Sequence, residues 1–308
     1  MASRAGSIGR RIGAFRAMIV IICLIDVVGL VWTGWRTQSF GRVLLGSLGL
    51  GLVEAFYIRL RPRPQIASLA GAAADLVAFS AAAAVLSYLA VALGFPLVDN
   101  TLAALDDRLG LDWLGYYHWY KAQPLPIKLV MMLSYFSDIM QILVLIVVFN
   151  FMGRSHGAAD RCRLLIWGYA LTVLAAIGIS GILPAAGEFV RHGVELDTGY
   201  IPQFQSAYDC TMTVIDLKTV QGIITFPSFH AALSVVIVFS AYGIWPLFGP
   251  LLVVNVIDIL STPVMGGHYF ADVFAGVGIA LFCILVLKCR PKFFGLDGAP
   301  LCFGAAAE

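Results

Sequence analysis

Eight runs of apolar sequence constrain this chain more than any other feature. A helix that crosses the hydrocarbon core of a bilayer needs about 20 apolar residues, and most of the runs are close to that length or exceed it. They lie at residues 17–33, 43–58, 66–94, 128–152, 163–184, 226–246, 249–265 and 269–288. Hydrophobic residues make up 60% of the chain and charged residues only 12%, so little sequence remains for a soluble domain. We predict an all-α polytopic transmembrane helix bundle of about eight spans.

The basic residues predict the orientation of the bundle. With the N-terminus in the cytoplasm, alternating loops place 13 of the 20 Lys and Arg residues on the cytoplasmic side, as the positive-inside rule favours. These are Arg4, Arg10, Arg11, Arg16, Arg59, Arg61, Arg63, Arg154, Arg161, Arg163, Lys288, Arg290 and Lys292. We expect a multi-pass integral membrane protein with both termini cytoplasmic. The net charge of +2 gives no indication of nucleic acid as a partner.

A first histidine segment begins the sixth apolar run. Pro227 and Ser228 precede the run, a composition typical of a helix start, because proline tolerates the first turn and serine caps unpaired amides. The free N–H groups and the positive dipole end of such a helix suit phosphate. His230 would then lie in the first turn, facing any anion held there, and Ser228 is a candidate substrate contact.

A second histidine segment opens the last apolar run. Gly266 and Gly267 precede His268 and allow the backbone to approach a ligand closely, which makes Gly267 a candidate substrate contact. His268 and Asp272 are four residues apart, so on a helix they share one face. The carboxylate would fix the imidazole tautomer and leave the other nitrogen free to attack. Because the two histidine segments bracket one apolar hairpin, we expect both imidazoles at the same, non-cytoplasmic membrane surface.

This histidine pair indicates phosphoryl chemistry on a lipid. His268 is the predicted nucleophile, and His230 is the predicted acid that protonates the leaving oxygen and later the base for an incoming acceptor. Neither a metal nor a cofactor is required if amides and cations hold the phosphate oxygens. A lone histidine at a membrane edge is more commonly a headgroup contact or a satisfied polar residue, so the prediction depends on the two segments together.

The spacing of these residues resembles a known family. Pro227-Ser228-x-His230 and Ser261-Thr262-x5-His268-x3-Asp272 are similar to the histidine motifs of the type 2 phosphatidic acid phosphatase (PAP2) superfamily. The threonine after Ser261, where the better-known phosphatases have arginine, favours the branch that contains inositol phosphorylceramide synthases. The resemblance to bacterial members of this branch extends upstream to Asp99, Asp106, Leu109-Gly110, Asp112-Trp113, Tyr135 and Gln141.

The resemblance covers about residues 95–285. It implies a six-helix core with its site at the outer membrane face, a phosphohistidine on His268 assisted by Asp272, and His230 as proton donor. We therefore expect N-terminal transmembrane helices over residues 1–94, a PAP2-like catalytic core over residues 95–288 and a cytoplasmic tail over residues 289–308.

The chain departs from the superfamily pattern in the groups that bind phosphate. The first motif, a lysine followed seven residues on by Arg-Pro, is absent. Arg61-Pro62 and Arg63-Pro64 fall on the predicted cytoplasmic side, without such a lysine. Lys218 and Arg191, in the outer stretch 185–225, are the candidate replacements, although a charged loop residue is usually just exposed.

Three further features are consistent with a lipid site. Phe229 replaces a glycine that is common in the histidine motif, and it fits a lipid-chain contact or simple packing equally well. Residues 96–127 mix acids with Trp and Tyr, which suits either a helix in the outer headgroup layer or an aromatic belt without chemistry. Residues 185–225 lead into the first histidine segment as either a lid or a plain connection.

Carboxylates inside the apolar runs keep a second hypothesis open. Asp26, Glu54, Asp75, Asp138 and Asp258 fall within predicted spans, where a carboxylate demands a partner or water. They mark the ion pathway of a transporter, or they are interhelical contacts, with Asp138 and Asp258 as candidate supports of the site. A transporter also predicts inverted repeats with broken helices, and the sequence gives no sign of them.

The sequence therefore predicts an integral membrane enzyme that cleaves or transfers a phosphate-containing group of a lipid. If water attacks the intermediate, the enzyme is a lipid phosphatase. If the hydroxyl of an acceptor such as ceramide or diacylglycerol attacks, it is a phosphotransferase. The missing arginines favour transfer, because a phosphodiester donor carries less charge than a phosphate monoester. A polytopic transporter is the competing hypothesis.

Overall fold

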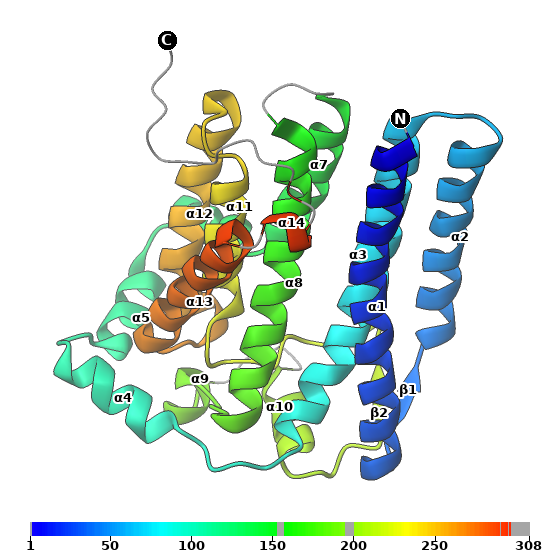
Figure 1. Ribbon diagram of the computed structural model, residues 1–308. Helices are drawn as coiled ribbons and strands as arrows, with labels where there is room; N and C mark the ends of the chain where they lie inside the picture. Colours follow the sequence, from blue (N-terminus) through cyan, green and yellow to red (C-terminus); the bar gives the residue numbers. More distant parts are fainter. Residues whose placement is uncertain (1, 153–156, 195–199, 290, 295, 297–308) are drawn as a thin grey trace.

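The protein is a bundle of long α-helices with one small pair of strands (Figure 1). The computed structural model describes residues 2–152, 157–194, 200–289, 291–294 and 296. Most of the predicted tail 289–308 lies outside the described residues, and its described part contains the short helix α14 (Pro291–Phe294). The predicted all-α polytopic bundle is confirmed.

Six helices in the described part of the chain are long and apolar enough to cross a membrane. They are α1 (Ala2–Thr33), α2 (Phe40–Arg59), α3 (Pro64–Val91), α8 (Ala158–Ile182), α12 (Trp245–Gly266) and α13 (Phe270–Cys289). Each of them overlaps one of the predicted apolar runs. The shortest, α2 and α13, have 20 residues each, which corresponds to about 30 Å, the thickness of the hydrocarbon core.

The fourth apolar run, residues 128–152, forms a bent pair of helices. α6 (Leu125–Tyr135) and α7 (Asp138–Phe151) meet at 57°. Ser137 accounts for the break, because its amide and its hydroxyl both donate to the carbonyl of Ser134, at 3.1 and 2.7 Å. These bonds close a tight turn in place of an α-helical one. Counted as one span, the pair brings the described candidate spans to seven.

The sixth apolar run, residues 226–246, contains the short helix α11 (Phe229–Ser240). Its 12 residues extend about 18 Å, less than the thickness of the bilayer core. The helix begins only after Ser228, and beyond Ser240 the chain turns at Gly243, which has a φ of 81°. Of the eight predicted runs, seven therefore give candidate spans, and this one gives a helix of about half the length.

Short elements gather at the end of the bundle opposite the start of α1 (Figure 1). They are β1 (Arg36–Gln38), α4 (Asp99–Arg108), α9 (Glu188–Arg191), α10 (Tyr200–Tyr208) and β2 (Val214–Asp216). β1 and β2 pair in parallel, with Thr37 opposite Ile215. α5 (Trp113–Ala122) connects α4 to α6, so the mixed segment 96–127 contains two short helices.

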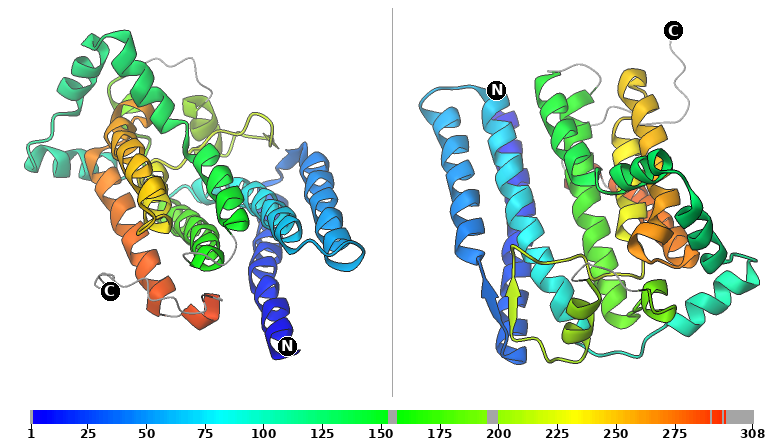
Figure 2. Two further views of the ribbon diagram at one scale, coloured as in Figure 1. Left: turned by 90° about the horizontal axis from the view of Figure 1, so that it is seen from above. Right: turned by 180° about the vertical axis from the view of Figure 1, so that it is seen from behind.

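The hydrophobic core lies around α8, which packs against α3, α7, α11 and α13. Phe79 of α3, Leu165 of α8, Val236 of α11 and Ile284 of α13 are buried in one cluster. α2 packs on α3 at the edge of the molecule, as the view from above shows (Figure 2). The N-terminal helices therefore join the rest of the bundle through α1 and α3, whose side chains enter the same cluster.

A guanidinium connects the first three helices. Arg16 of α1 donates to Glu54 of α2 at 2.6 Å and to Asp75 of α3 at 2.7 Å. Two of the five predicted intramembrane acids are therefore interhelical contacts. Asp26, also on α1, is buried, and its Oδ1 atom has no hydrogen-bond partner among the described residues.

Two further carboxyl groups meet beneath the histidine-bearing end of the bundle. Asp138 of α7 and Asp258 of α12 lie close enough to interact electrostatically. Asp258 also accepts a hydrogen bond from the hydroxyl of Ser234 on α11, at 2.5 Å. The two acids therefore lie where α7, α11 and α12 meet.

Candidate active site

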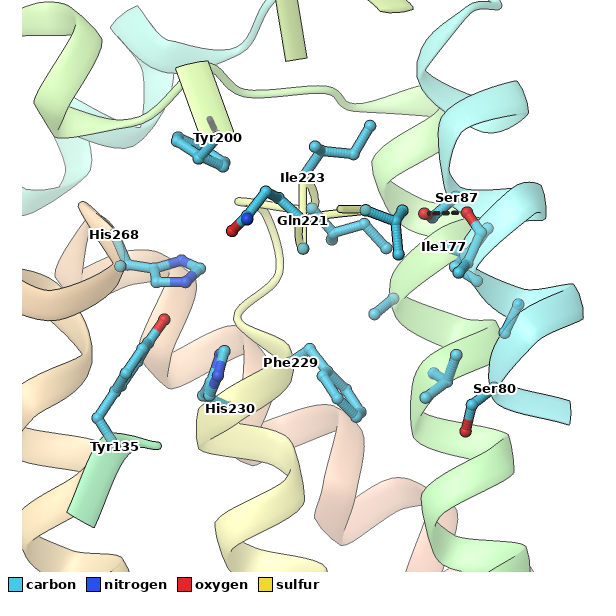
Figure 3. Close-up of a pocket in the computed structure, with 18 of the residues that line it drawn as sticks. Ser80, Ser87, Tyr135, Ile177, Tyr200, Gln221, Ile223, Phe229, His230 and His268 are labelled. Atoms are coloured by element: carbon cyan, nitrogen blue, oxygen red, sulfur yellow. Dashed lines mark hydrogen bonds between the residues drawn. The ribbon is translucent and has the colours of Figure 1, made fainter. Parts of the chain in front are cut away.

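Both histidines line one cavity of about 440 Å³, between α3, α6, α8, α11 and the segment that precedes α11. Figure 3 shows His268 and His230 on the same side of this cavity, with the hydroxyl of Tyr135 reaching between them. The imidazoles are close enough to interact electrostatically. The structure thus brings together the two histidines that the sequence spacing paired.

A serine cap fixes the start of α11, as the sequence suggests. The hydroxyl of Ser228 accepts a hydrogen bond from the amide of Ala231 at 3.4 Å, and its own amide donates to the carbonyl of Asp272 at 3.0 Å. Gly276 makes this approach feasible, because any side chain there would collide with the carbonyl oxygen of Ser228. His230, the second residue of α11, is therefore held against the first turns of α13.

His268 lies in the short link between α12 and α13. The four-residue spacing predicts that His268 and Asp272 share a helical face, but α13 begins only at Phe270. Asp272 accepts a hydrogen bond from the amide of Tyr269 at 2.9 Å, as in a capping box. The same carboxylate lies 3.4 Å from Nδ1 of His268. A helix cap thus produces the His–Asp contact that the sequence analysis expected from a shared face.

Burial determines the protonation of His268. Only 4% of the residue is exposed, and this burial lowers the pKa of His268 to about 4, opposed in part by the nearby backbone of Thr225. The imidazole is therefore neutral at pH 7. Nδ1 lies 3.4 Å from Asp272, and a proton held at Nδ1 by this carboxylate leaves Nε2 with its lone pair.

Tyr135 lies close to both histidines. A Cβ atom at Gly266 would lie 2.7 Å from the Tyr135 hydroxyl and 2.9 Å from Nε2 of His268, so these two groups are close neighbours across the glycine. The ring of Tyr135 also stacks on His230, with a centroid distance of 4.1 Å and an interplanar angle of 18°. Nε2 of His268 thus points toward the part of the cavity that Tyr135 and His230 border.

Gly267 is required for the path of the chain. Its φ of 65° is in the left-handed region that favours glycine, and a Cβ atom there would overlap the ring of Phe189. Its carbonyl accepts a hydrogen bond from the amide of Glu188 at 2.7 Å. Burial raises the pKa of the Glu188 carboxyl to about 7, while nearby Arg191 lowers it.

Asp106 of α4 holds the first turn of α13. Its two carboxylate oxygens accept hydrogen bonds from the amides of Phe270 and Ala271, at 2.7 and 2.8 Å. These are amides that a helix leaves unpaired at its start. Burial raises the pKa of Asp106, and the two amide hydrogen bonds oppose that shift. The carboxylate fixes the backbone two residues after His268.

Asp99, at the start of α4, binds the loop that faces His268. It accepts hydrogen bonds from the amides of Ala186 and Gly187, at 3.0 and 2.8 Å, and from the hydroxyl of Tyr269, at 3.0 Å. Asp99 and Asp106 belong to the upstream part of the family resemblance. Both position the segment that carries His268.

The predicted substrate contacts occupy different places. Phe229 lines the cavity. Ser228 is a fully buried helix cap, and Gly267 packs on Phe189, so neither lines it. Lys218 follows β2 and Arg191 ends α9, both exposed and both outside the cavity wall. Among the described residues that line the cavity, none is Lys or Arg.

The cavity also contains polar groups that the sequence analysis did not assign to it. Tyr135 entered only through the family resemblance. Tyr200 and Gln221 line the cavity as well, and the Tyr200 hydroxyl donates to the carbonyl of Ala186 at 3.0 Å. No local pattern marks these residues, because only the folding of the segment before α11 brings them to the histidines.

These observations define a class, a polytopic helical membrane protein in which a buried His–Asp pair faces a second histidine. A family model described as PAP2 superfamily matches residues 100–286. The chain belongs to the PAP2 superfamily. Comparisons with curated proteins and with solved structures found no match. Helices α1, α2 and α3 precede the matched residues.

Proposed function

We propose that this protein is an integral membrane enzyme that cleaves or transfers a phosphate-containing group of a lipid, through a phosphohistidine on His268, at the non-cytoplasmic face. Members of the PAP2 superfamily are generally phosphatases. The observation that carries the proposal is the orientation of His268. Its Nδ1 atom lies 3.4 Å from Asp272, and its Nε2 atom points toward Tyr135 in the cavity that His230 also lines.

In the first half-reaction, Nε2 of His268 attacks phosphorus, and the bond from phosphorus to the leaving alcohol oxygen breaks. Burial and the neighbouring His268 lower the pKa of His230 to about 3 in the free protein, so the negative charge of the bound phosphate has to favour the protonated form. His230 then gives its proton to the leaving oxygen and ends neutral. Asp272 stabilises the positive charge that develops on the His268 ring. The product is a phosphohistidine and a free alcohol.

In the second half-reaction, the hydroxyl of an acceptor transfers its proton to His230 and attacks the same phosphorus. The phosphorus–nitrogen bond breaks, and His268 returns to its neutral form. With water as the acceptor the enzyme is a phosphatase. With a lipid alcohol such as ceramide or diacylglycerol it is a phosphotransferase, and the released product is a new phosphodiester lipid.

The lining of the cavity favours transfer from a phosphodiester donor. No Lys or Arg occurs among the described lining residues, and a phosphodiester carries one negative charge fewer than a fully ionised monoester. Thr262, where the better-known phosphatases have arginine, is buried, and its hydroxyl donates to the carbonyl of Asp258 at 2.9 Å. These features support the branch that contains inositol phosphorylceramide synthases.

A transporter is the second candidate, and one observation favours it. The α6–α7 pair is a broken helix, bent by 57°, with Asp138 at the break. In the described residues it is the one bent pair of this kind, whereas inverted repeats predict a related pair. Tyr135, at the end of α6, lines the histidine cavity, so the enzyme proposal also accounts for the break.

The proposal is tested by turnover of purified protein in detergent, with chelator present. The substrates are labelled phosphatidic acid and labelled phosphatidylinositol, the latter with and without ceramide. We expect wild-type turnover and losses of about 10²-fold or more in His268→Ala and His230→Ala. His118→Ala, on an exposed face of α5, is the matched histidine control and should retain full activity. Undiminished turnover in His268→Ala removes the proposed nucleophile.

A further inference from the structure

The histidine cavity continues into an apolar arm between α3 and α8. The wall of this α3–α8 arm includes Ser80, Ala83, Ala84 and Ser87 of α3 and Tyr169, Val173, Ala176 and Ile177 of α8. We propose that the arm binds a hydrocarbon chain of the substrate lipid. The identity of the head group rests on the proposed function, but the chain site does not depend on the chemistry at His268.

The four residues of α3 form one helical face. Their spacing of three, one and three residues repeats the period of an α-helix, so all four side chains point to the same side of α3. Each is small, which leaves space that larger side chains would fill. Figure 3 shows Ser80, Ser87 and Ile177 on the side of the cavity remote from His268.

The two serines of the arm offer no free hydroxyl to a ligand. The hydroxyl of Ser80 shares a hydrogen bond with the Tyr169 hydroxyl at 2.8 Å, and the hydroxyl of Ser87 donates to the carbonyl of Ala84 at 2.7 Å. A polar group that entered the arm would lose its hydrogen bonds to water without replacement, which is unfavourable. A hydrocarbon chain loses nothing and gains burial.

The arm joins the polar end of the cavity at Phe229. This residue lines the cavity next to His230, and its ring meets that of Tyr169 edge-on, with a centroid distance of 5.9 Å. A lipid whose phosphorus lies at the histidines can therefore extend a chain past Phe229 into the arm. The whole cavity, about 440 Å³, is within the range of about 300–1,000 Å³ that small-molecule sites occupy.

The position of the arm also matches a lipid chain. α3 and α8 are both candidate membrane spans, so the arm lies between two helices that a bilayer would surround, and Figure 3 shows Ser80 and Ser87 across the cavity from His230 and His268. α3 precedes residues 100–286, the part that matches the PAP2 superfamily. The N-terminal helices thus supply one wall of a site whose chemistry belongs to the family core.

Substitution of Ala84 by phenylalanine tests the proposal. Ala84 is half-buried, so the larger side chain fills the arm. Each buried methylene contributes about 0.8 kcal/mol, or about fourfold in kcat/KM. Wild type should therefore strongly prefer dipalmitoyl over dihexanoyl phosphatidic acid at a constant mole fraction in mixed micelles. In Ala84→Phe we expect dipalmitoyl turnover to fall about tenfold or more, and dihexanoyl turnover to fall far less.

The matched control is Val77→Phe, which adds the same ring to a position of α3 that is 40% exposed and does not line the cavity. It should keep the wild-type preference for long chains. The proposal is overturned if Ala84→Phe keeps the same preference as Val77→Phe and wild type.

A binding measurement separates this proposal from the proposed function. A phosphatidic acid with a diazirine in one acyl chain is photo-crosslinked to His268→Ala protein, and the labelled peptides are mapped. Label on residues 80–87 of α3 or 173–177 of α8 supports the arm, and label confined to other helices overturns it. If wild type turns over no lipid phosphate at all, the proposed function fails, while the crosslinks still decide whether the arm holds a chain.

Discussion

Two carboxylates of the N-terminal helices face a guanidinium, whereas two carboxylates near His268 face backbone amides. Glu54 and Asp75 each form an ion pair with Arg16. Asp272 and Asp106 instead accept hydrogen bonds from backbone amides, in the α12–α13 link and in the first turn of α13. A long arginine side chain holds helices together but follows their movements. Amide hydrogen bonds fix the backbone itself, which is what a precisely oriented nucleophile requires.

The two regions also differ in how deeply they are packed. Within the most apolar stretch of each helix, 6% of α2 is buried inside the protein, compared with 61% of α8 at the centre of the bundle. Changes in the α1–α2 edge should therefore affect stability slightly and chemistry not at all. Substitutions of the carboxylates that bind backbone amides should reduce turnover more than they reduce thermal stability.

Asp272→Asn should produce the largest effect among the carboxylates. An asparagine keeps an oxygen that accepts the Tyr269 amide, so the helix cap is retained, but it removes the charge that faces Nδ1 of His268. We expect kcat to fall by about 10³–10⁴-fold with little change in thermal stability. The measurement is turnover alongside thermal unfolding in detergent. Wild-type kcat in a folded Asp272→Asn protein would contradict the role of the pair.

The pH profile gives the next largest effect. The pKa of His268 is lowered to about 4, so its lone pair is available above that pH and is lost as pH falls below it. For a phosphodiester lipid, whose phosphate gains no proton in this range, we expect the acidic limb of kcat/KM at about pH 4 or below. We also expect an alkaline limb on which His230 loses its proton, because burial and His268 lower the pKa of His230 to about 3 in the free protein. An acidic limb centred near 6.5, the value for an exposed histidine, would contradict the buried, neutral nucleophile.

Asp106→Asn should have a smaller effect. Each oxygen of Asp106 accepts one amide, and the amide group of asparagine accepts only one of them. The loss of one hydrogen bond leaves a buried donor unpaired, at a cost of about 1–3 kcal/mol of stability, and should reduce kcat about tenfold through the less firmly held His268. Asp107→Asn, at the exposed neighbouring position, is the control. Equal behaviour of the two variants would argue against the amide anchor.

Arg16→Gln should have the smallest effect on chemistry. It breaks the contacts that join α1, α2 and α3, and the Arg16 side chain is 42% exposed, so we expect a loss of only about 1 kcal/mol. Thermal unfolding and specific activity per folded molecule measure the two quantities separately. A large fall in kcat here would show that the N-terminal helices position the histidines, contrary to the comparison.

The helices could be predicted because burial in a bilayer dominates their sequences. The break at Ser137 could not, since it depends on two hydrogen bonds to one carbonyl rather than on a proline or glycine. The half-length of α11 was also hidden, because the apolar sequence continues beyond Ser240 while the chain turns at Gly243. Hydropathy predicts which residues are buried in the bilayer, but it does not predict the residue at which a helix ends.

The candidate site was predictable where its contacts are local. The 3.4 Å contact between His268 and Asp272 joins residues four apart, whereas Asp106 binds residues 164 and 165 positions away. The sequence of a loop does not show toward which site a charged side chain points. Lys218 and Arg191 were therefore predicted to bind phosphate, although neither lines the cavity. The small residues of α3 that line the α3–α8 arm resemble those of any apolar span, and only the packing of α3 on α8 shows that they border a cavity.

The most direct test of the account is to trap the intermediate. Wild-type protein is mixed with a lipid radiolabelled at phosphorus, quenched in base during turnover and digested, and the labelled peptide is sequenced by mass spectrometry. The account predicts a base-stable, acid-labile phosphoryl group on Nε2 of His268, absent from His268→Ala. Turnover with label on another residue, or with no covalent label at any quench time, would contradict it.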